Sequence, residues 1–160
     1  MERIYLLPGE FEVVRTPCKL ATLLGSCVGV CLRHVDKPYA AMNHFLLARA
    51  RPEDRDIGRY GDRATTAIIS LMRKLDPTDG VLRARIFGGA QVLDCLAPNS
   101  AIGLANIAVA RQILAEHRIP IEAEDVGGIQ GRRISFDTAK GQVRVQKIQT
   151  AAEFVASLHP

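Results

Sequence analysis

The sequence has no uninterrupted apolar stretch approaching the roughly 18 residues that a membrane-spanning helix requires. Residues 1–8 form too short a segment for a signal peptide, and an acid, Glu2, comes too early in it. Internal repeats, linkers and low-complexity tracts are also absent. Together these absences predict a cytoplasmic protein that folds as a single domain over residues 1–160.

The composition is that of an ordinary globular protein, with 48% hydrophobic and 24% charged residues in a chain of 160. A chain of this length can bury a substantial core without covalent cross-links. The four cysteines are therefore expected to stay reduced in a cytosol rather than to form disulfides. They are Cys18, Cys27, Cys31 and Cys95.

The net charge of +4 makes the chain mildly basic, and an arginine-rich run extends from Arg49 to Arg63. Acidic residues, among them Asp54 and Asp56, interrupt this run. A surface that binds nucleic acid normally shows one sign of charge and aromatic residues on which bases stack. The run therefore favours a solvated face of mixed charge and no nucleic-acid partner, while a protein partner with an acidic surface remains compatible with it.

Short apolar runs bounded by turn residues indicate strands, and apolar residues at every third or fourth position indicate helices. The expected strands cover residues 3–7, 11–14, 20–24, 28–32, 39–47, 82–86, 119–126, 133–136 and 143–145. The strands and helices do not alternate strictly, so a doubly wound sheet is excluded. The order instead predicts an α/β (α+β) fold, a mixed sheet or β-sandwich with two main helices packed outside.

Helical spacing is found between Asp56 and Leu75, and the expected inward residues are Ala64, Ala67, Ile68, Leu71, Met72 and Leu75. A second helix, capped by Asn99 or Ser100, is expected to end at about His117. Its expected inward residues are Ile102, Ala105, Val109, Ile113 and Leu114. A short terminal helix is expected over residues 150–158.

Cys27 lies between Gly25-Ser26 and Val28-Gly29 at the start of one apolar segment, and His44 lies inside another. A thiol becomes a strong nucleophile once it is ionised, and an imidazole within hydrogen-bond reach is a common base for it. Glycines on both sides of the cysteine let a carbonyl substrate approach the backbone closely. The same residues also fit two buried strands with a tight turn, because free cysteine is commonly buried.

A zinc site is another interpretation of the group Cys18, Cys27, Cys31, His34 and His44. The three residues between Cys27 and Cys31 match a common ligand spacing. On a strand, however, these two cysteines point the same way with no turn between them. Their neighbours Val28, Val30 and Leu32 are typical of a core, so the pattern favours a strand over a zinc site.

A phosphate-binding site at residues 87–90 or 125–128 fails on sequence context. Neither segment has the lysine of a P-loop or the third glycine of a dinucleotide fingerprint. The sequence therefore predicts neither a metal nor a cofactor.

Nucleophilic catalysis is the remaining chemistry. Cys27 would attack a carbonyl carbon, and His44 would take the thiol proton and later protonate the leaving group. Backbone N–H groups near Gly25, Ser26 and Cys27 would hold the oxyanion. The spacing of these residues does not choose among acyl substrates.

Two longer motifs carry the candidate site, LLGSCVGVCL at residues 23–32 and AMNHFLL at residues 41–47. Three more follow in order, RYGD at 59–62, IFGGA at 86–90 and DVGGIQGR at 125–132. Together they span nearly the whole chain, which resembles the CheD family of chemoreceptor glutamine deamidases.

The resemblance implies an α/β layered sandwich and an enzyme of bacterial chemotaxis. Such an enzyme hydrolyses glutamine side chains on the cytoplasmic helices of chemoreceptors to glutamate and releases ammonia through a thioester. Cys27 matches the family's nucleophile and His44 its base. From the residues themselves, the bare backbone of Phe87-Gly88-Gly89-Ala90 is expected to border the substrate glutamine. A CheC-type phosphatase would be the regulatory partner, in competition with the receptor.

The family's third catalytic residue is a threonine, six residues before the cysteine, where this chain has Ala21. Thr22 is the next residue, and a shift of one position on a strand moves a side chain to the opposite face. Either the turn before Cys27 is one residue shorter here, or another group orients His44. Thr22 is therefore the expected third residue.

Two functions are compatible with the sequence. The chain is either an active deamidase or a non-catalytic signalling module of the same fold that binds a CheC-type phosphatase or a receptor. A depressed pKa of the Cys27 thiol in the folded protein would favour the enzyme, and an ordinary pKa would favour the binding module.

Overall fold

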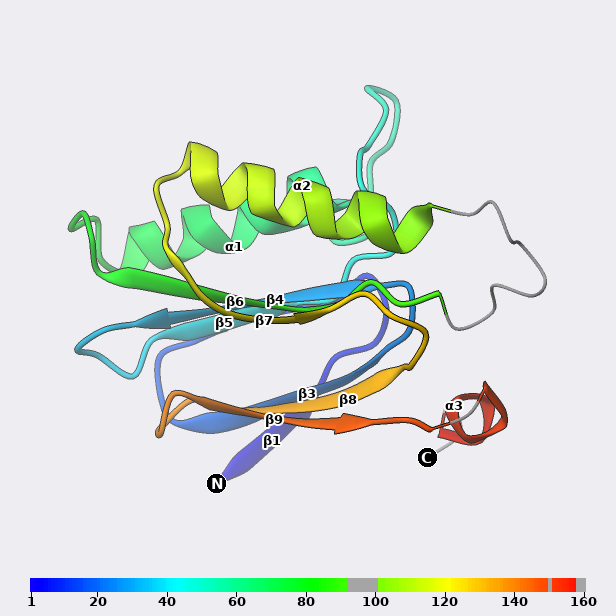
Figure 1. The fold of residues 1–160 in the computed structure, drawn as a ribbon. Helices are drawn as coiled ribbons and strands as arrows, with labels where there is room; N and C mark the ends of the chain where they lie inside the picture. The colour runs from blue at the N-terminus through cyan, green and yellow to red at the C-terminus, as the bar shows by residue number, and fades with distance from the viewer. Residues whose placement is uncertain (92–100, 150, 158–160) are drawn as a thin grey trace.

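The computed structural model describes residues 1–91, 101–149 and 151–157. Two β-sheets stack face to face, and two long helices cover the outer face of one of them (Figure 1). In chain order the elements are β1 (Glu2–Tyr5), β2 (Phe11–Val14), β3 (Cys18–Leu24), β4 (Val28–His34), β5 (Ala40–Asn43), α1 (Gly61–Leu75), β6 (Leu82–Gly88), α2 (Ile102–Glu116), β7 (Ile121–Val126), β8 (Arg132–Asp137), β9 (Gln142–Lys147) and α3 (Ala151–Ser157).

The strand order is β1-β3-β8-β9 in one sheet and β2-β5-β4-β6-β7 in the other. The β1–β3 and β6–β7 pairs are parallel, whereas the remaining pairs are antiparallel. The consecutive strands β3 and β4 lie in different sheets, so the turn between them crosses from one sheet to the other. The predicted layered sandwich with mixed sheets and two outer helices is confirmed.

Buried side chains form two apolar layers. Ile68 of α1 and Leu114 of α2 pack with Ile86 of β6 in the layer between the helices and their sheet. Leu20 and Phe136 belong to the second layer, between the two sheets. Each such side chain stabilises the fold by about 1.5–3 kcal/mol, and this rigid stack supports the loops at its ends.

The strand predicted over residues 39–47 ends early, because β5 stops at Asn43. The side-chain Oδ1 of Asn43 accepts the N–H of Val30 at 2.8 Å, a bond that the strand ladder would otherwise take to a main-chain carbonyl. The pairing resumes only at Phe45, which bridges to Val28. His44 thus lies at an interruption of the strand and not within it.

The predicted inward face of α1 is partly wrong. Leu71 is 37% exposed, whereas Thr65 and Ile69 are buried with Ile68 and Met72. Thr65 was missed because periodicity in apolar residues does not reveal a buried hydroxyl. That hydroxyl accepts a hydrogen bond from Asn43 Nδ2 at 3.4 Å.

The predicted inward face of α2 is displaced by one residue at its beginning. Ile102 and Ala105 are exposed, and Asn106 and Ile107 are buried instead. This helix carries apolar residues around most of its circumference, so their spacing defines its face poorly. None of the helices in residues 1–91, 101–149 and 151–157 is long and apolar enough to cross a membrane.

Five residues on which predictions depend lie outside the described residues. They are Cys95, the two expected caps Asn99 and Ser100, and Thr150 and Leu158, which bound the expected last helix. The helix that the structure describes there is α3, Ala151–Ser157.

Candidate active site

The Thr22 hydroxyl and the His44 imidazole form a buried hydrogen bond that joins the two sheets. Thr22 Oγ1 on β3 lies 2.6 Å from His44 Nδ1, and it donates its single proton to the carbonyl oxygen of Leu6 at 2.7 Å. Because that proton is committed to the carbonyl, His44 Nδ1 must carry a proton and donate to Thr22. The lone pair for accepting a proton is therefore on His44 Nε2.

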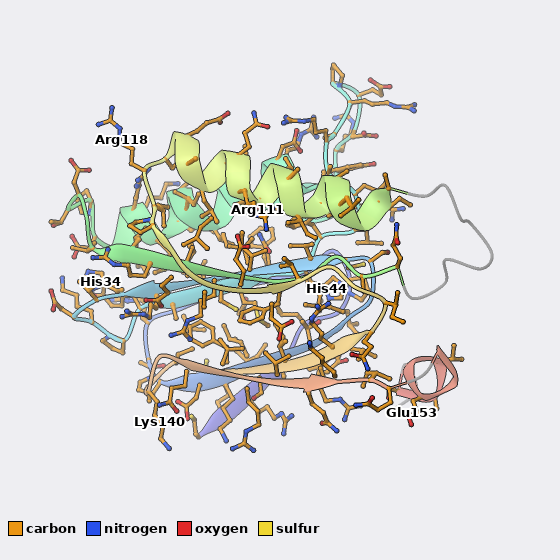
Figure 2. The ribbon with its side chains drawn as sticks, viewed as in Figure 1. His34, His44, Arg111, Arg118, Lys140 and Glu153 are labelled. Atoms are coloured by element: carbon orange, nitrogen blue, oxygen red, sulfur yellow. The ribbon has the colours of Figure 1, made fainter. Side chains whose placement is uncertain are left out.

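The main chain of His44 is held at both polar groups by the turn after β1. Its N–H donates to the carbonyl of Glu10 at 3.1 Å, and its carbonyl accepts the N–H of Gly9 at 2.8 Å. Figure 2 shows the ring of His44 in the space between the two sheets. The backbone and Nδ1 thus fix the orientation of the ring, and Nε2 is the atom left to react.

His44 Nε2 is buried and has no hydrogen-bond partner among the described residues. Burial also lowers the pKa of the imidazole from 6.5 to about 4, because a charged ring is poorly solvated there. The ring is therefore neutral near pH 7. A neutral imidazole with a free, oriented lone pair is suited to act as a general base.

Cys27 ends the turn between β3 and β4, and its side chain packs against the layer between the sheets. Burial raises the pKa of its thiol from 9.0 to about 11. A hydrogen bond from its own backbone N–H and the charge of Arg59 act in the opposite direction but are outweighed. The thiol is therefore protonated at rest. A depressed pKa is expected of an enzyme, and the pKa of Cys27 is raised instead.

Cys27 and His44 each directly precede one member of the same backbone pair. Val28 and Phe45, which follow them in sequence, exchange two backbone hydrogen bonds of 3.1 and 3.0 Å. No hydrogen bond joins the thiol to His44 among the described residues, since Nε2 has no partner there. The structure thus brings Thr22 and His44 into hydrogen-bond contact. Cys27 is next to a residue that pairs with the neighbour of His44, but its thiol makes no hydrogen bond to the His44 ring. Catalytic hydrogen bonds are often long in the absence of substrate.

The turn that carries Cys27 is anchored by the segment after β6. The carbonyl of Gly25 accepts the N–H of Ala90, and the carbonyl of Cys27 accepts the N–H of Gly89, both at 2.9 Å. The N–H of Cys27 lies beside its own sulfur. A donor beside the sulfur is suited to an oxyanion that forms on the attacked carbon.

Gly88 and Gly89 have positive φ angles of +104° and +74°, which few residues other than glycine adopt. A Cβ atom on Gly88 would lie 2.3 Å from the carbonyl oxygen of Cys27. Glycine at this position therefore lets β6 approach the cysteine turn. The Phe87 side chain is buried in the layer between the sheets.

Of the two adjacent residues Ala21 and Thr22, only Thr22 contacts His44 through a polar side chain. Thr22 makes the hydrogen bond to His44, whereas Ala21 offers no polar side-chain atom. Two participants were missed in the sequence, the Leu6 carbonyl that orients the Thr22 hydroxyl and the buried side chain of Asn106. A lone asparagine among apolar residues of α2 is the only signal that pointed to the latter.

Metal ligation receives no support from the described residues. No three His, Cys, Asp or Glu side chains gather there as metal ligands do. Cys31, the proposed ligand nearest to Cys27 in sequence, is buried in the layer between the sheets, and burial raises the pKa of its thiol to about 12. Such a thiol is a core side chain, not a preformed thiolate ligand.

Comparison with known proteins identifies the family. The family model described as "CheD chemotactic sensory transduction" matches residues 46–147, which is more than half of the chain. The chain belongs to the CheD family. The matched segment begins after His44, so this match by itself assigns no role to Thr22, Cys27 or His44.

Relatives in the CheD family match over a longer part of the chain. A protein of Geobacter sulfurreducens named "Probable chemoreceptor glutamine deamidase CheD 2" is 34% identical over 92% of this chain and 91% of its own length. Proteins named "Probable chemoreceptor glutamine deamidase CheD" are similar as well. The one from Rhodospirillum rubrum is 39% identical over 94% of this chain and 85% of its own length. The one from Stenotrophomonas maltophilia is 40% identical over 92% and 74%.

Proposed function

We propose that this CheD-family chain is a cytoplasmic enzyme that deamidates glutamine side chains of chemoreceptors, with Cys27 as the nucleophile and His44 as the base. The names of its relatives support the reaction and the substrate class. One structural observation carries the proposed mechanism, the buried Nε2 of His44, which has no partner among the described residues and whose tautomer follows from Thr22.

The proposed reaction begins with attack of Cys27 Sγ on the carboxamide carbon of glutamine, while the thiol proton passes to His44 Nε2. The Cys27 N–H donates to the resulting oxyanion. The imidazolium then protonates the departing nitrogen, and ammonia leaves a thioester behind. A water molecule, deprotonated by His44, then attacks the thioester, and the imidazolium returns the proton to the departing sulfur as glutamate is released.

The raised pKa of Cys27 and the lowered pKa of His44 affect the timing of the first step. Both shifts have the same cause, burial, which disfavours the charged forms. A separated thiolate and imidazolium are therefore not the resting state of this site. The proton must move as the S–C bond forms, as it does when a hydroxyl nucleophile is activated by histidine.

A non-catalytic module that binds a CheC-type phosphatase or a receptor is the second candidate. The raised pKa of Cys27 and the lack of a hydrogen bond between Cys27 and His44 favour it. The unpartnered His44 Nε2 stands against it, because a buried acceptor without a partner costs about 1–3 kcal/mol of stability. A module that only binds has no need for such an atom, whereas a base requires it.

The deciding experiment measures ammonia release from the cytoplasmic signalling fragment of a chemoreceptor. Wild type is compared with Cys27→Ala and His44→Ala, and mass spectrometry locates glutamines converted to glutamate. Cys31→Ala is the matched control, because Cys31 is a buried cysteine on the adjoining strand β4. Loss of release in the first two variants alone supports the enzyme and both roles.

Absence of release from folded wild type on several receptors would overturn the enzyme in favour of the binding module. A CheC-type phosphatase is the proposed regulatory partner in either case. For the enzyme, adding that phosphatase should slow ammonia release, because partner and receptor are proposed to compete for the chain.

A further inference from the structure

Asn106 of α2 connects the segment that carries Cys27 with the segment that carries His44. Its side chain is fully buried, and Nδ2 donates to the carbonyl of Ser26 at 3.0 Å and to the carbonyl of Leu46 at 2.9 Å. Ser26 directly precedes Cys27, and Leu46 lies two residues after His44. One amide group therefore holds the backbone beside both reactive side chains.

The orientation of this amide follows from chemistry alone. Both neighbours are carbonyl oxygens, which only accept, so the group between them must be the NH2 group. A flipped side chain would place its own oxygen against two others. Asn106 thus uses both of its donor hydrogens, and no apolar side chain of similar size can replace that arrangement.

Asn106 acts where the backbone pairing of the two segments has ended. Val28 and Phe45 exchange two backbone hydrogen bonds, but this is an isolated bridge. Toward the cysteine turn, Asn106 supplies the connection that strand pairing does not. Gly103, one turn earlier on α2, approaches Gly89 so closely that a Cβ atom would lie 2.3 Å from the Gly89 carbonyl oxygen. This contact holds the helix against the segment after β6 that anchors the cysteine turn.

We propose that Asn106 is a positioning residue that sets the separation of Cys27 and His44 by clamping the Ser26 and Leu46 carbonyls. The expected effect of Asn106 on ammonia release rests on the proposed function. Its expected effect on the reactivity of the Cys27 thiol rests on the contacts alone. Asn106 Oδ1 is buried and has no partner among the described residues, as is also true of His44 Nε2. An asparagine that served only to fill the core would leave an acceptor unmet for no gain, because an apolar side chain fills a core without one.

The test uses Asn106→Leu, which keeps the number and branching of the side-chain heavy atoms but removes both donors. Ile113→Ala is the matched control, since Ile113 is a buried residue two turns further along α2 whose apolar side chain donates no hydrogen bond to either reactive segment. A displacement of the order of 1 Å at a reacting atom can slow catalysis about 100-fold. Asn106→Leu should therefore lower kcat between about 10-fold and 100-fold with little change in KM. Ile113→Ala should lower Tm and leave kcat unchanged.

A double-mutant cycle separates positioning from general destabilisation. If Asn106 acts through the placement of His44, then Asn106→Leu in a His44→Ala background should lower the residual rate by less than about twofold. Additive effects in the cycle would overturn the proposal. An unchanged kcat in folded Asn106→Leu, judged by circular dichroism, would overturn it as well.

Alkylation of Cys27 by iodoacetamide, located by mass spectrometry, gives a readout that does not require deamidation. If wild type releases no ammonia, the proposed function fails, and alkylation alone decides about Asn106. The proposal then predicts that Asn106→Leu and His44→Ala each change the Cys27 alkylation rate while Ile113→Ala does not. Equal rates in all four proteins would overturn it.

Discussion

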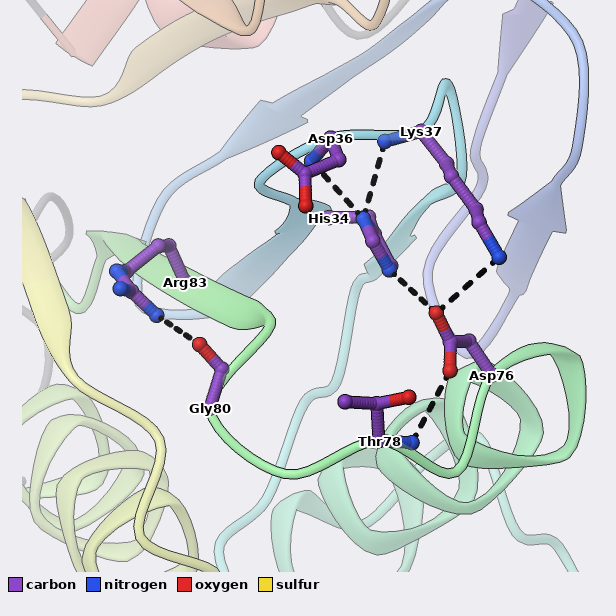
Figure 3. Close-up of polar contacts among 7 residues, drawn as sticks. All are labelled: His34, Asp36, Lys37, Asp76, Thr78, Gly80 and Arg83. Atoms are coloured by element: carbon purple, nitrogen blue, oxygen red, sulfur yellow. Dashed lines mark hydrogen bonds and ion pairs between the residues drawn. The ribbon is translucent and has the colours of Figure 1, made fainter.

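Two buried histidines, His34 and His44, lie well apart in the molecule (Figure 2). Their rings are hydrogen-bonded in different ways. His34 ends β4, and both of its ring nitrogens are occupied. Its Nδ1 accepts the N–H groups of Asp36 and Lys37, each at 3.0 Å, and its Nε2 lies 2.8 Å from an oxygen of Asp76 (Figure 3). Such a ring ties a turn to the end of α1 and has no lone pair left for chemistry.

The surroundings of His34 reinforce its structural role. Lys37 Nζ lies 3.3 Å from the same oxygen of Asp76. Hydrogen bonds from Thr78, followed by those from His34 and Lys37, hold the pKa of Asp76 below its usual range. This cluster closes two turns, and every polar atom named in it has a partner.

His44 differs in one atom. Its Nδ1 is bonded to Thr22, and its Nε2 is buried with no partner among the described residues. Burial by itself therefore does not separate a structural histidine from a reactive one. The occupancy of the second ring nitrogen does, because a base needs a free lone pair.

The largest expected effect is on catalysis through His44. His44→Gln keeps a polar side chain of similar size but removes the basic nitrogen. General-base catalysis contributes about 10²–10⁴-fold, so kcat for ammonia release should fall by that factor. His34→Gln is the matched control and should keep kcat within about twofold of wild type. A similar loss of kcat in both folded variants would remove the distinction between the two rings.

The next effect is on stability against pH, because the pKa of His44 is about 4 in the folded protein and 6.5 ordinarily. Between these values the unfolded chain binds a proton that the folded chain excludes, so stability falls as pH drops from 6.5 to 4. The free energy of unfolding should fall by about 3 kcal/mol from this group. Urea unfolding of wild type and His44→Gln at several pH values measures it, and the variant should show a smaller decrease over this window.

A smaller effect is expected from Thr22→Val, which keeps the shape of the side chain and removes the hydroxyl. The His44 Nδ1–H and the Leu6 carbonyl would each lose a partner, which costs about 1–3 kcal/mol. Loss of ring orientation should lower kcat about 10-fold to 100-fold. The swapped double variant Ala21→Thr with Thr22→Ala places a threonine on the other face of β3 and should not restore the rate. Restoration would mean that the face of the strand is irrelevant.

The smallest effect is expected at the structural histidine. His34→Leu would leave the Asp36 and Lys37 N–H groups and an oxygen of Asp76 without that partner, in a region partly open to water. The free energy of unfolding should fall by about 1–2 kcal/mol, with kcat retained. Urea unfolding and ammonia release on the same sample measure both. A loss of kcat without a loss of stability would contradict the structural role.

Much of the fold follows from local pattern. Alternating or short apolar runs predicted the strands to within a few residues, and turn residues such as Pro8-Gly9 and Asp36-Lys37-Pro38 marked where they end. The helix faces were less accurate, because Thr65 and Asn106 are polar residues that the core accepts once a partner is available. Hydrogen-bond partners from distant segments are not visible in periodicity.

The layered fold, the family resemblance and the candidacy of Cys27 and His44 could be inferred from the sequence, since they depend on motifs and on residue type. The folded structure was needed to see that Thr22 and not Ala21 contacts His44, that Nε2 carries the free lone pair, and that Asn106 bridges the two reactive segments. Tautomer, pKa and clamping depend on burial and on partners such as Leu6 and Ser26. Those partners lie 16 and 80 residues away in sequence from the side chains that bond to them.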